Sequence, residues 1–182
     1  MTFGKYIGLF FMGLALKPFA SPASPQMPPN SQEIKIPDQL KPPAGEALIL
    51  SVHATGHQIY VCQAGSDGKR AWTLKAPQAE LFDEKGVAIG SHYAGPTWKL
   101  NDGSEVTGKM AARVDAPDKS AIPWLLVTVA SNSGKGALMH ATSIQRIHTL
   151  GGLPPAECAE SQLGTETKSS YTADYYFYAP KK

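Results

Sequence analysis

Cysteine is scarce in this 182-residue sequence, which contains two cysteines and no Cys-x-x-Cys motif. In an exported chain, a lone pair of cysteines more often forms a disulfide than a metal or redox site. Cys62 and Cys158 also lie far apart in the chain, so a bond between them would close a long loop. We therefore predict a structural disulfide, worth about 4–5 kcal/mol in the chain-entropy model.

Long hydrophobic runs are also rare. The run at residues 6–16 follows Lys5 and precedes small residues that end at Ala23. A membrane-spanning helix needs roughly 20 apolar residues, so this run is too short to cross a bilayer. The pattern is typical of a signal peptide over residues 1–23, with export to the periplasm or the exterior. A retained anchor is the alternative, and no later segment is apolar for long enough to be transmembrane.

The chain that signal-peptide cleavage would leave has no excess of positive or negative charge. Removal of residues 1–23 takes away Lys5 and Lys17, which leaves 15 basic and 15 acidic residues. The remaining basic residues form no block. Such a balanced chain has no electrostatic reason to bind nucleic acid or an anionic membrane, and we expect neither partner.

Common catalytic and cofactor motifs are missing as well. The chain has no Gly-x-Ser-x-Gly, no His-Glu-x-x-His, no phosphate loop, and no Gly-x-Gly-x-x-Gly between a strand and a helix. We expect no cofactor and no metal. Any active site would have to be assembled from scattered residues.

The sequence does contain a regular β pattern. After a Pro-rich linker over residues 24–44, residues 45–180 show short stretches of alternating apolar and polar side chains between Gly-rich turns. This spacing predicts one all-β domain, an antiparallel β-sandwich or barrel of about ten strands. At most one short helix is expected, over residues 156–163. A turn at Thr55-Gly56 is expected to separate strands over residues 47–54 and 57–63, and the segment with Pro77 to separate strands over residues 70–75 and 79–83.

The clearest turn is Asn101-Asp102-Gly103. A three-residue loop with Gly103 in the left-handed region sets Trp98 opposite Val106 and puts both on one face. A two-residue loop would not, so we predict the three-residue hairpin.

The order and spacing of several motifs resemble a known family. These motifs are His57-Gln58-Ile59-Tyr60, His92-Tyr93-Ala94-Gly95-Pro96-Thr97-Trp98, Ile122-Pro123-Trp124 and Tyr171-Thr172-Ala173-Asp174-Tyr175. Over roughly residues 45–180 the chain resembles the domain of unknown function 3455 family, small exported proteins of bacteria and fungi. The resemblance implies no activity and no catalytic residue. It places both cysteines within the family pattern.

The candidate site lies where a strand is expected to end at Gly95. Loops at strand ends commonly carry function, and the imidazole of His92 can act as an acid, a base or a hydrogen-bonding anchor. We predict a pocket around His92, Tyr93 and Trp98, with Arg146 nearby. The alternative is that His92 and Trp98 only pack in the core.

Arg146 stands in an otherwise apolar strand. A buried guanidinium needs a carboxylate, so we predict a structural ion pair with Asp174, and Asp115 is the other candidate partner. Recognition of an anion or carboxylate by Arg146 is the alternative.

Two further side-chain groups suggest other sites. His53 and His57 are expected to be cross-strand neighbours, but no third ligand is evident, and we predict no metal site. The C-terminal tyrosines and the three tryptophans could form a glycan platform, although aromatic strands more often fill a core.

These features favour an exported β domain that binds a small molecule, a glycan or an envelope component. One alternative is an enzyme with His92 as acid or base and Arg146 as an anion clamp. The other is a structural cell-envelope protein. The sequence predicts no oligomeric state.

Overall fold

The computed structural model describes residues 1, 2, 4 and 35–181. The chain divides into a unit over residues 1–34 and a unit over residues 35–182, and the second unit contains the β domain. The predicted signal peptide lies almost wholly outside the described residues, as does the first part of the predicted linker.

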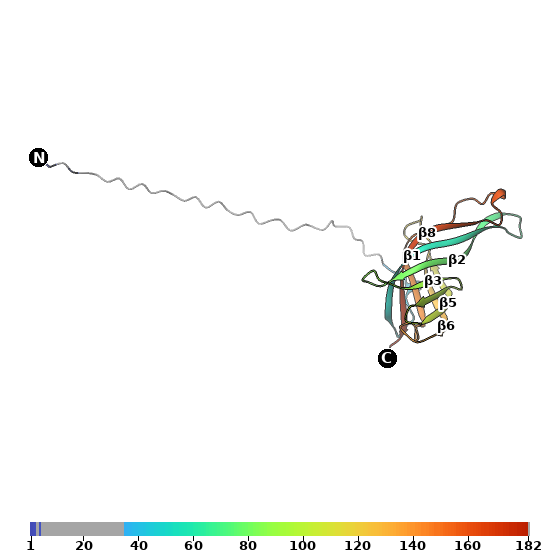
Figure 1. Cartoon of the computed structure of the whole chain (residues 1–182), viewed down its shortest axis with the longest axis horizontal. Helices are drawn as coiled ribbons and strands as arrows, with labels where there is room; N and C mark the ends of the chain where they lie inside the picture. The colour runs from blue at the N-terminus through green and yellow to red at the C-terminus, as the bar shows by residue number, and fades with distance from the viewer. Residues whose placement is uncertain (3, 5–34, 182) are drawn as a thin grey trace. The chain divides into compact units, whose positions relative to one another are not determined.

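Eight antiparallel strands form one closed barrel, in which each strand pairs with the next and β8 pairs with β1 (Figure 1). The predicted all-β class is confirmed, and the two predicted architectures resolve to the barrel. The strands are β1 (Glu46–Ala64), β2 (Arg70–Phe82), β3 (Ala88–Tyr93), β4 (Thr97–Leu100), β5 (Glu105–Val114), β6 (Trp124–Ser133), β7 (Ser143–Gly151) and β8 (Glu166–Pro180).

The barrel has eight strands because two expected breaks are absent. Thr55-Gly56 continues β1 instead of turning the chain. A Cβ at Gly56 would lie 2.2 Å from the backbone oxygen of Gln78, so this glycine allows β1 and β2 to approach closely. Pro77 lies inside β2 without interrupting it. The pairing of β2 with β3 begins only at Ala79, so the missing N–H of Pro77 falls on an unpaired edge.

Helical structure among the described residues is limited to two 3₁₀ turns, η1 (Asp38–Leu40) and η2 (Glu160–Gln162). The short helix expected over residues 156–163 is reduced to η2, which begins after Cys158. No helix in the described part of the chain is long and apolar enough to cross a membrane.

The barrel interior holds the main hydrophobic core. On β8, the alternate residues Tyr171, Ala173, Tyr175 and Phe177 are all buried, as period-2 alternation requires. The hairpin between β4 and β5 has the predicted three-residue loop, with Trp98 opposite Val106 and Gly103 at φ +89°.

A second cluster of buried residues packs on η1. It includes Leu40, Trp124 and Ile147, and Leu40 is completely buried. The amide of Gln145 also donates a 2.6 Å hydrogen bond to the Leu40 carbonyl. The described end of the predicted linker, residues 35–44, is therefore partly integrated into the β domain, which extends further toward the N-terminus than residue 45.

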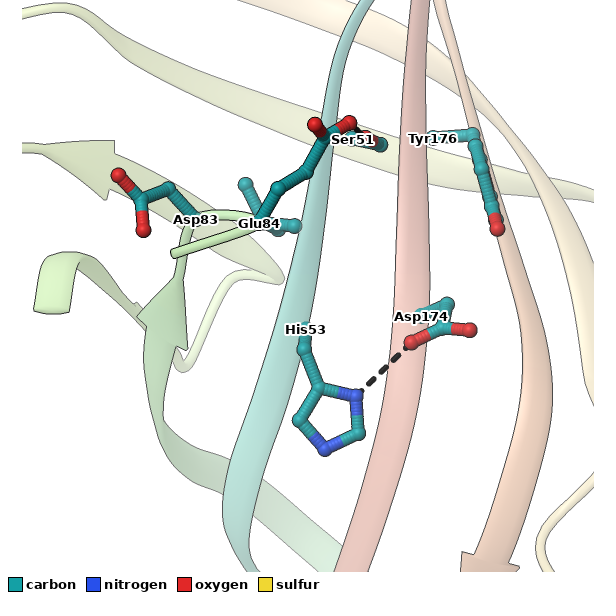
Figure 2. A pocket seen from close by; sticks show the side chains of 7 residues that line it. Ser51, His53, Asp83, Glu84, Asp174 and Tyr176 are labelled. Atoms are coloured by element: carbon teal, nitrogen blue, oxygen red, sulfur yellow. Dashed lines mark hydrogen bonds and ion pairs between the residues drawn. The ribbon is translucent and has the colours of Figure 1, made fainter. Parts of the chain in front are cut away.

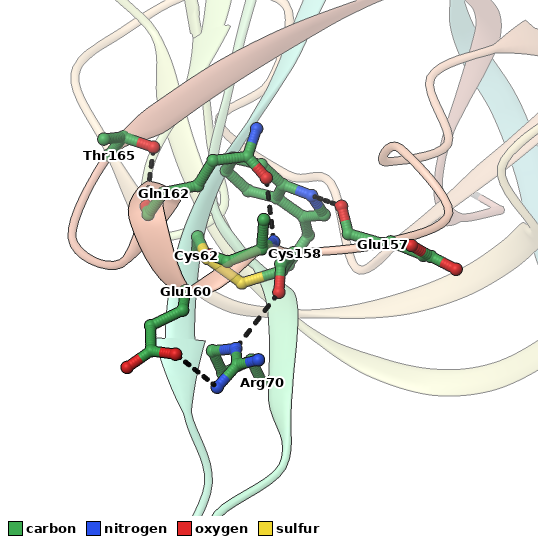
Figure 3. The surroundings of a disulfide bond; sticks show 9 residues. Cys62, Arg70, Glu157, Cys158, Glu160, Gln162 and Thr165 are labelled. Atoms are coloured by element: carbon green, nitrogen blue, oxygen red, sulfur yellow. Dashed lines mark hydrogen bonds and ion pairs between the residues drawn. A yellow bond between two sulfur atoms is a disulfide. The ribbon is translucent and has the colours of Figure 1, made fainter.

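Parts of β1, β2 and β8 continue beyond the rest of the barrel as a three-stranded arm (Figure 1). In the arm, residues 70–78 of β2 have no partner on β3, and residues 166–170 of β8 have none on β7. The predicted disulfide joins Cys62 on β1 to Cys158 in the segment that leads to β8 (Figure 3). Hydrogen bonds from Trp72 to the Glu157 carbonyl and from Arg70 to the Cys158 carbonyl attach the same segment to β2.

Candidate functional site

A cavity of about 310 Å³ lies where the arm meets the end of the barrel. One wall is the part of β2 with an unpaired edge, and another is the Gly95-Pro96 turn between β3 and β4. The floor comes from side chains that point into the barrel. The lining residues are Gln58, Leu74, Lys75, Ala76, Pro77, His92, Gly95, Pro96, Trp98, Met110, Leu125, Val127, Arg146 and Tyr175.

His92 is fixed in this cavity by two contacts. It lies opposite Trp98 in the β3–β4 ladder, and the two rings stack with centroids 4.3 Å apart and planes 13° apart. Its Nδ1 donates a 2.8 Å hydrogen bond to the carbonyl of Thr97. Because Nδ1 carries the proton, the neutral ring has its lone pair on Nε2.

The environment of His92 keeps the imidazole neutral. Its side chain is 2% exposed, and burial disfavours the charged form. Burial is the main cause that lowers the pKa of His92 to about 3, and the nearby charge of Arg146 lowers it further. The hydrogen bond to Thr97 acts in the opposite direction but is weaker.

Arg146 points to the same interior. It pairs with Tyr175 in the β7–β8 ladder, and Tyr175 faces inward. The guanidinium donates from Nε (3.2 Å) and Nη2 (2.8 Å) to the carbonyl of Pro123, which leaves three of its N–H groups for other acceptors.

The predicted ion pair between Arg146 and Asp174 is wrong. Successive residues of a strand point to opposite faces, so Asp174 faces outward when Tyr175 faces the interior. The Asp174 carboxylate accepts hydrogen bonds from Nδ1 of His53 and from Nδ1 of His148, each 2.8 Å long. The other candidate, Asp115, pairs with Lys119 across 4.0 Å.

Several buried polar atoms at this end of the barrel lack a hydrogen-bond partner among the described residues. They are Gln58 Nε2, Trp98 Nε1 and the hydroxyls of Tyr171 and Tyr175. Burial is the main cause that raises the pKa of both tyrosines, so these hydroxyls keep their protons. The two hydroxyls lie near each other, and Arg146 lies near that of Tyr175, but no pair among them has the geometry of a hydrogen bond. Buried polar groups are nearly always hydrogen-bonded, and each exception requires an explanation. Gln58, Trp98 and Tyr175 all line the cavity, which gives their unpaired groups a common location.

The structure places Tyr93 outside the cavity that the other predicted site residues line. His92, Trp98 and Arg146 line one cavity, but Tyr93 follows His92 on β3 and points to the outer face. The Tyr93 side chain is 37% exposed, and its hydroxyl donates to the carboxylate of Glu105 across 3.0 Å.

Among the cavity residues that the sequence did not predict, Gln58 and Tyr175 carry buried polar groups. Tyr175 shares the predicted inner face of β8, but nothing in the sequence indicates that its hydroxyl is unpaired. Gln58 has the same parity as Val52 and Ala54, which are buried on β1. A continuous strand would have placed Gln58 inside, but the turn predicted at Thr55-Gly56 hid that alternation.

A second, shallow hollow lies on the outer face (Figure 2). His53 and Asp174 lie in it beside Asp83 and Glu84, and Ser51 donates to Glu84. No group of three His, Cys, Asp or Glu side chains within the described residues could hold a metal ion. His53 and His57 are not cross-strand neighbours, because both lie on the uninterrupted strand β1.

The fold and the cavity define a class, a small antiparallel barrel domain with a largely apolar cavity that contains buried polar groups. A family model described as a protein of unknown function (DUF3455) matches residues 43–179. Because this match covers most of the chain, the protein belongs to the DUF3455 family, and the resemblance seen in the motifs is confirmed. No curated protein and no solved structure matches the chain.

Proposed function

We propose that this protein is an exported barrel domain that binds a small molecule in the cavity of His92, Trp98 and Arg146. The observation that carries the proposal is the set of buried, unpaired polar groups on Gln58, Trp98 and Tyr175. Leaving one such group unpaired costs about 1–3 kcal/mol, and a ligand that accepts hydrogen bonds from them would recover part of this cost.

The state of His92 supports binding over catalysis. A general base works best when its pKa lies near the operating pH, and the pKa of His92 is lowered to about 3. Its only hydrogen bond in the described part of the chain goes to a backbone carbonyl, so no titratable side chain orients it as a second catalytic group. An imidazole in this state is suited to hold a fixed position in the wall of the cavity and not to transfer a proton.

Most of the aromatic side chains suggested for a glycan platform are buried, and the partly buried ones, Trp72, Tyr176 and Tyr178, are divided between the arm and the barrel. Trp98, Trp124, Tyr171 and Tyr175 are at most 2% exposed, so none of them presents a ring face to a sugar chain on the surface. Export is supported by the signal-peptide pattern and by the disulfide, since disulfides persist in oxidising compartments. A purely structural envelope role would leave the unpaired groups in the cavity without explanation.

A thermal-shift screen of the oxidised chain without residues 1–23 tests this proposal. The variant Ala76→Phe places a ring in the cavity, and Ala71→Phe adds the same ring at an exposed position of the same strand. We expect some small polar compounds to raise the melting temperature of the wild type and of Ala71→Phe, but not of Ala76→Phe. Equal shifts in all three proteins, or no shift in the wild type, would contradict the proposal.

A further inference from the structure

We propose that the ligand is a small organic monocarboxylate, whose carboxylate contacts Arg146 and whose apolar body lies against Pro77, Pro96 and Leu125. This inference rests on the proposed function and specifies the chemistry of the occupant. Three independent features of the cavity support it: its charge, its excess of donors and its apolar walls.

The charge of the cavity is positive and not neutralised from within. Arg146 makes no ion pair within the described residues, and no Asp or Glu lines the cavity. The other cationic lining residue, Lys75, is already paired with Glu166. A partly buried guanidinium without a carboxylate is unfavourable, because the interior does not solvate it as water does. An anionic ligand would supply the missing counter-charge.

The hydrogen-bonding groups of the cavity select an acceptor. The unpaired groups are mostly donors: the indole N–H of Trp98, the amide nitrogen of Gln58 and the hydroxyl of Tyr175. Arg146 adds its three remaining N–H groups. An ionised carboxylate has only acceptors, with about four lone-pair sites, and it can accept two parallel bonds from a guanidinium. A neutral alcohol or amide would bring its own donors into a cavity that offers few acceptors.

The apolar walls and the volume of the cavity favour an organic ligand over an inorganic anion. Pro77, Pro96, Leu125 and Val127 present apolar surface beside the polar groups. A phosphate or sulfate ion would leave this surface in contact with water, whereas a hydrocarbon body would bury it. The volume of about 310 Å³ lies at the small end of ligand pockets, so the ligand is smaller than a typical drug.

Isothermal titration calorimetry with matched probes tests the inference. Benzoate carries the carboxylate and a compact apolar ring, benzamide keeps the ring without the charge, and inorganic phosphate keeps charge without the ring. The proteins are wild type, Arg146→Gln and Arg113→Gln, in which Arg113 is an exposed arginine on β5. We expect Arg146→Gln to weaken benzoate binding roughly 10- to 100-fold, since hydrogen bonds to charged groups contribute about 1.5–3 kcal/mol. Arg113→Gln should bind benzoate like wild type, and benzamide should bind both variants and wild type equally weakly.

Each alternative outcome identifies what is wrong. Benzamide binding as tightly as benzoate would overturn the carboxylate class but leave small-molecule binding intact. Phosphate binding more tightly than benzoate would overturn the inference that the ligand has an apolar organic body. No benzoate binding by the wild type would overturn the inference, while the thermal-shift screen tests the proposed function separately. If Arg146→Gln fails to fold, Arg146→Lys keeps the charge but not the forked geometry, and an unchanged benzoate affinity there would refute a bidentate contact.

Discussion

Replacing His92 by phenylalanine should change how the stability of the barrel depends on pH. Phenylalanine can keep the stacking contact with Trp98, but it loses the hydrogen bond to the Thr97 carbonyl and cannot take up a proton. The substitution therefore removes a stabilising hydrogen bond at all pH values. It also removes a side chain whose protonation in the unfolded chain destabilises the folded barrel at low pH.

The magnitude follows from the pKa of His92, which falls from 6.5 to about 3 on folding. Below pH 6.5 the unfolded chain binds a proton that the folded barrel does not, so the wild type loses stability as the pH falls toward 3. The loss is about 1.4 kcal/mol per pH unit, or roughly 3 kcal/mol at pH 4. The lost hydrogen bond costs the variant about 1–2 kcal/mol at every pH. We therefore expect His92→Phe to be less stable at pH 7.5 and more stable at pH 4, with the two curves crossing at about pH 5.5.

Equilibrium unfolding in urea, followed by tryptophan fluorescence between pH 4 and pH 8, measures this difference. The control is His140→Phe, because His140 is exposed and lies outside the cavity, and its curve should run parallel to that of the wild type. If the difference between wild type and His92→Phe is the same at all pH values, His92 is not a buried neutral imidazole, and the assignment of its role fails.

Three further results are expected. Replacing Cys62 and Cys158 by alanine should lower the free energy of unfolding by about 4 kcal/mol, and a reductant should then no longer change the melting temperature. Gly56→Ala should destabilise the barrel by roughly 1–3 kcal/mol in urea unfolding because its Cβ would collide with the backbone of β2, whereas a wild-type midpoint would show that Gly56 is not a close-approach position. Tyr93→Phe should leave benzoate affinity unchanged in calorimetry, since Tyr93 faces outward. A tenfold loss of benzoate affinity would show that Tyr93 belongs to the binding site.

Much of the barrel follows from local patterns. Alternation identified the inner face of β8, and side-chain parity around Asn101 gave the β4–β5 register, because both depend only on residues close in sequence. The merging of two pairs of expected strands could not be predicted in this way. Glycine and proline are common in turns, so the sequence around Gly56 and Pro77 indicates breaks between strands. Whether a strand can contain them depends on the neighbouring strand: β2 approaches β1 closely at Gly56, and β3 does not pair with β2 at Pro77.

The cavity could be predicted only in part. A pocket around His92 and Trp98 with Arg146 nearby was expected from the strand end and from an isolated charge, and the structure brings these three residues together. The predicted ion pair of Arg146 with Asp174 is wrong, because inward and outward residues alternate along β8 and Asp174 faces outward. The unpaired groups on Gln58 and Tyr175 depend on distances across the barrel, which no sequence pattern contains.

The most direct test observes the indole N–H of Trp98 in ¹⁵N–¹H spectra of tryptophan-labelled protein during a benzoate titration. This N–H is buried, lines the cavity and has no hydrogen-bond partner within residues 35–181, whereas the indole of Trp72 donates to the Glu157 carbonyl in the arm. We expect the Trp98 signal to move with benzoate concentration and the Trp72 signal to stay in place. A Trp98 signal that does not move with benzoate, or with any compound that raises the melting temperature, would contradict a binding site at the end of the barrel.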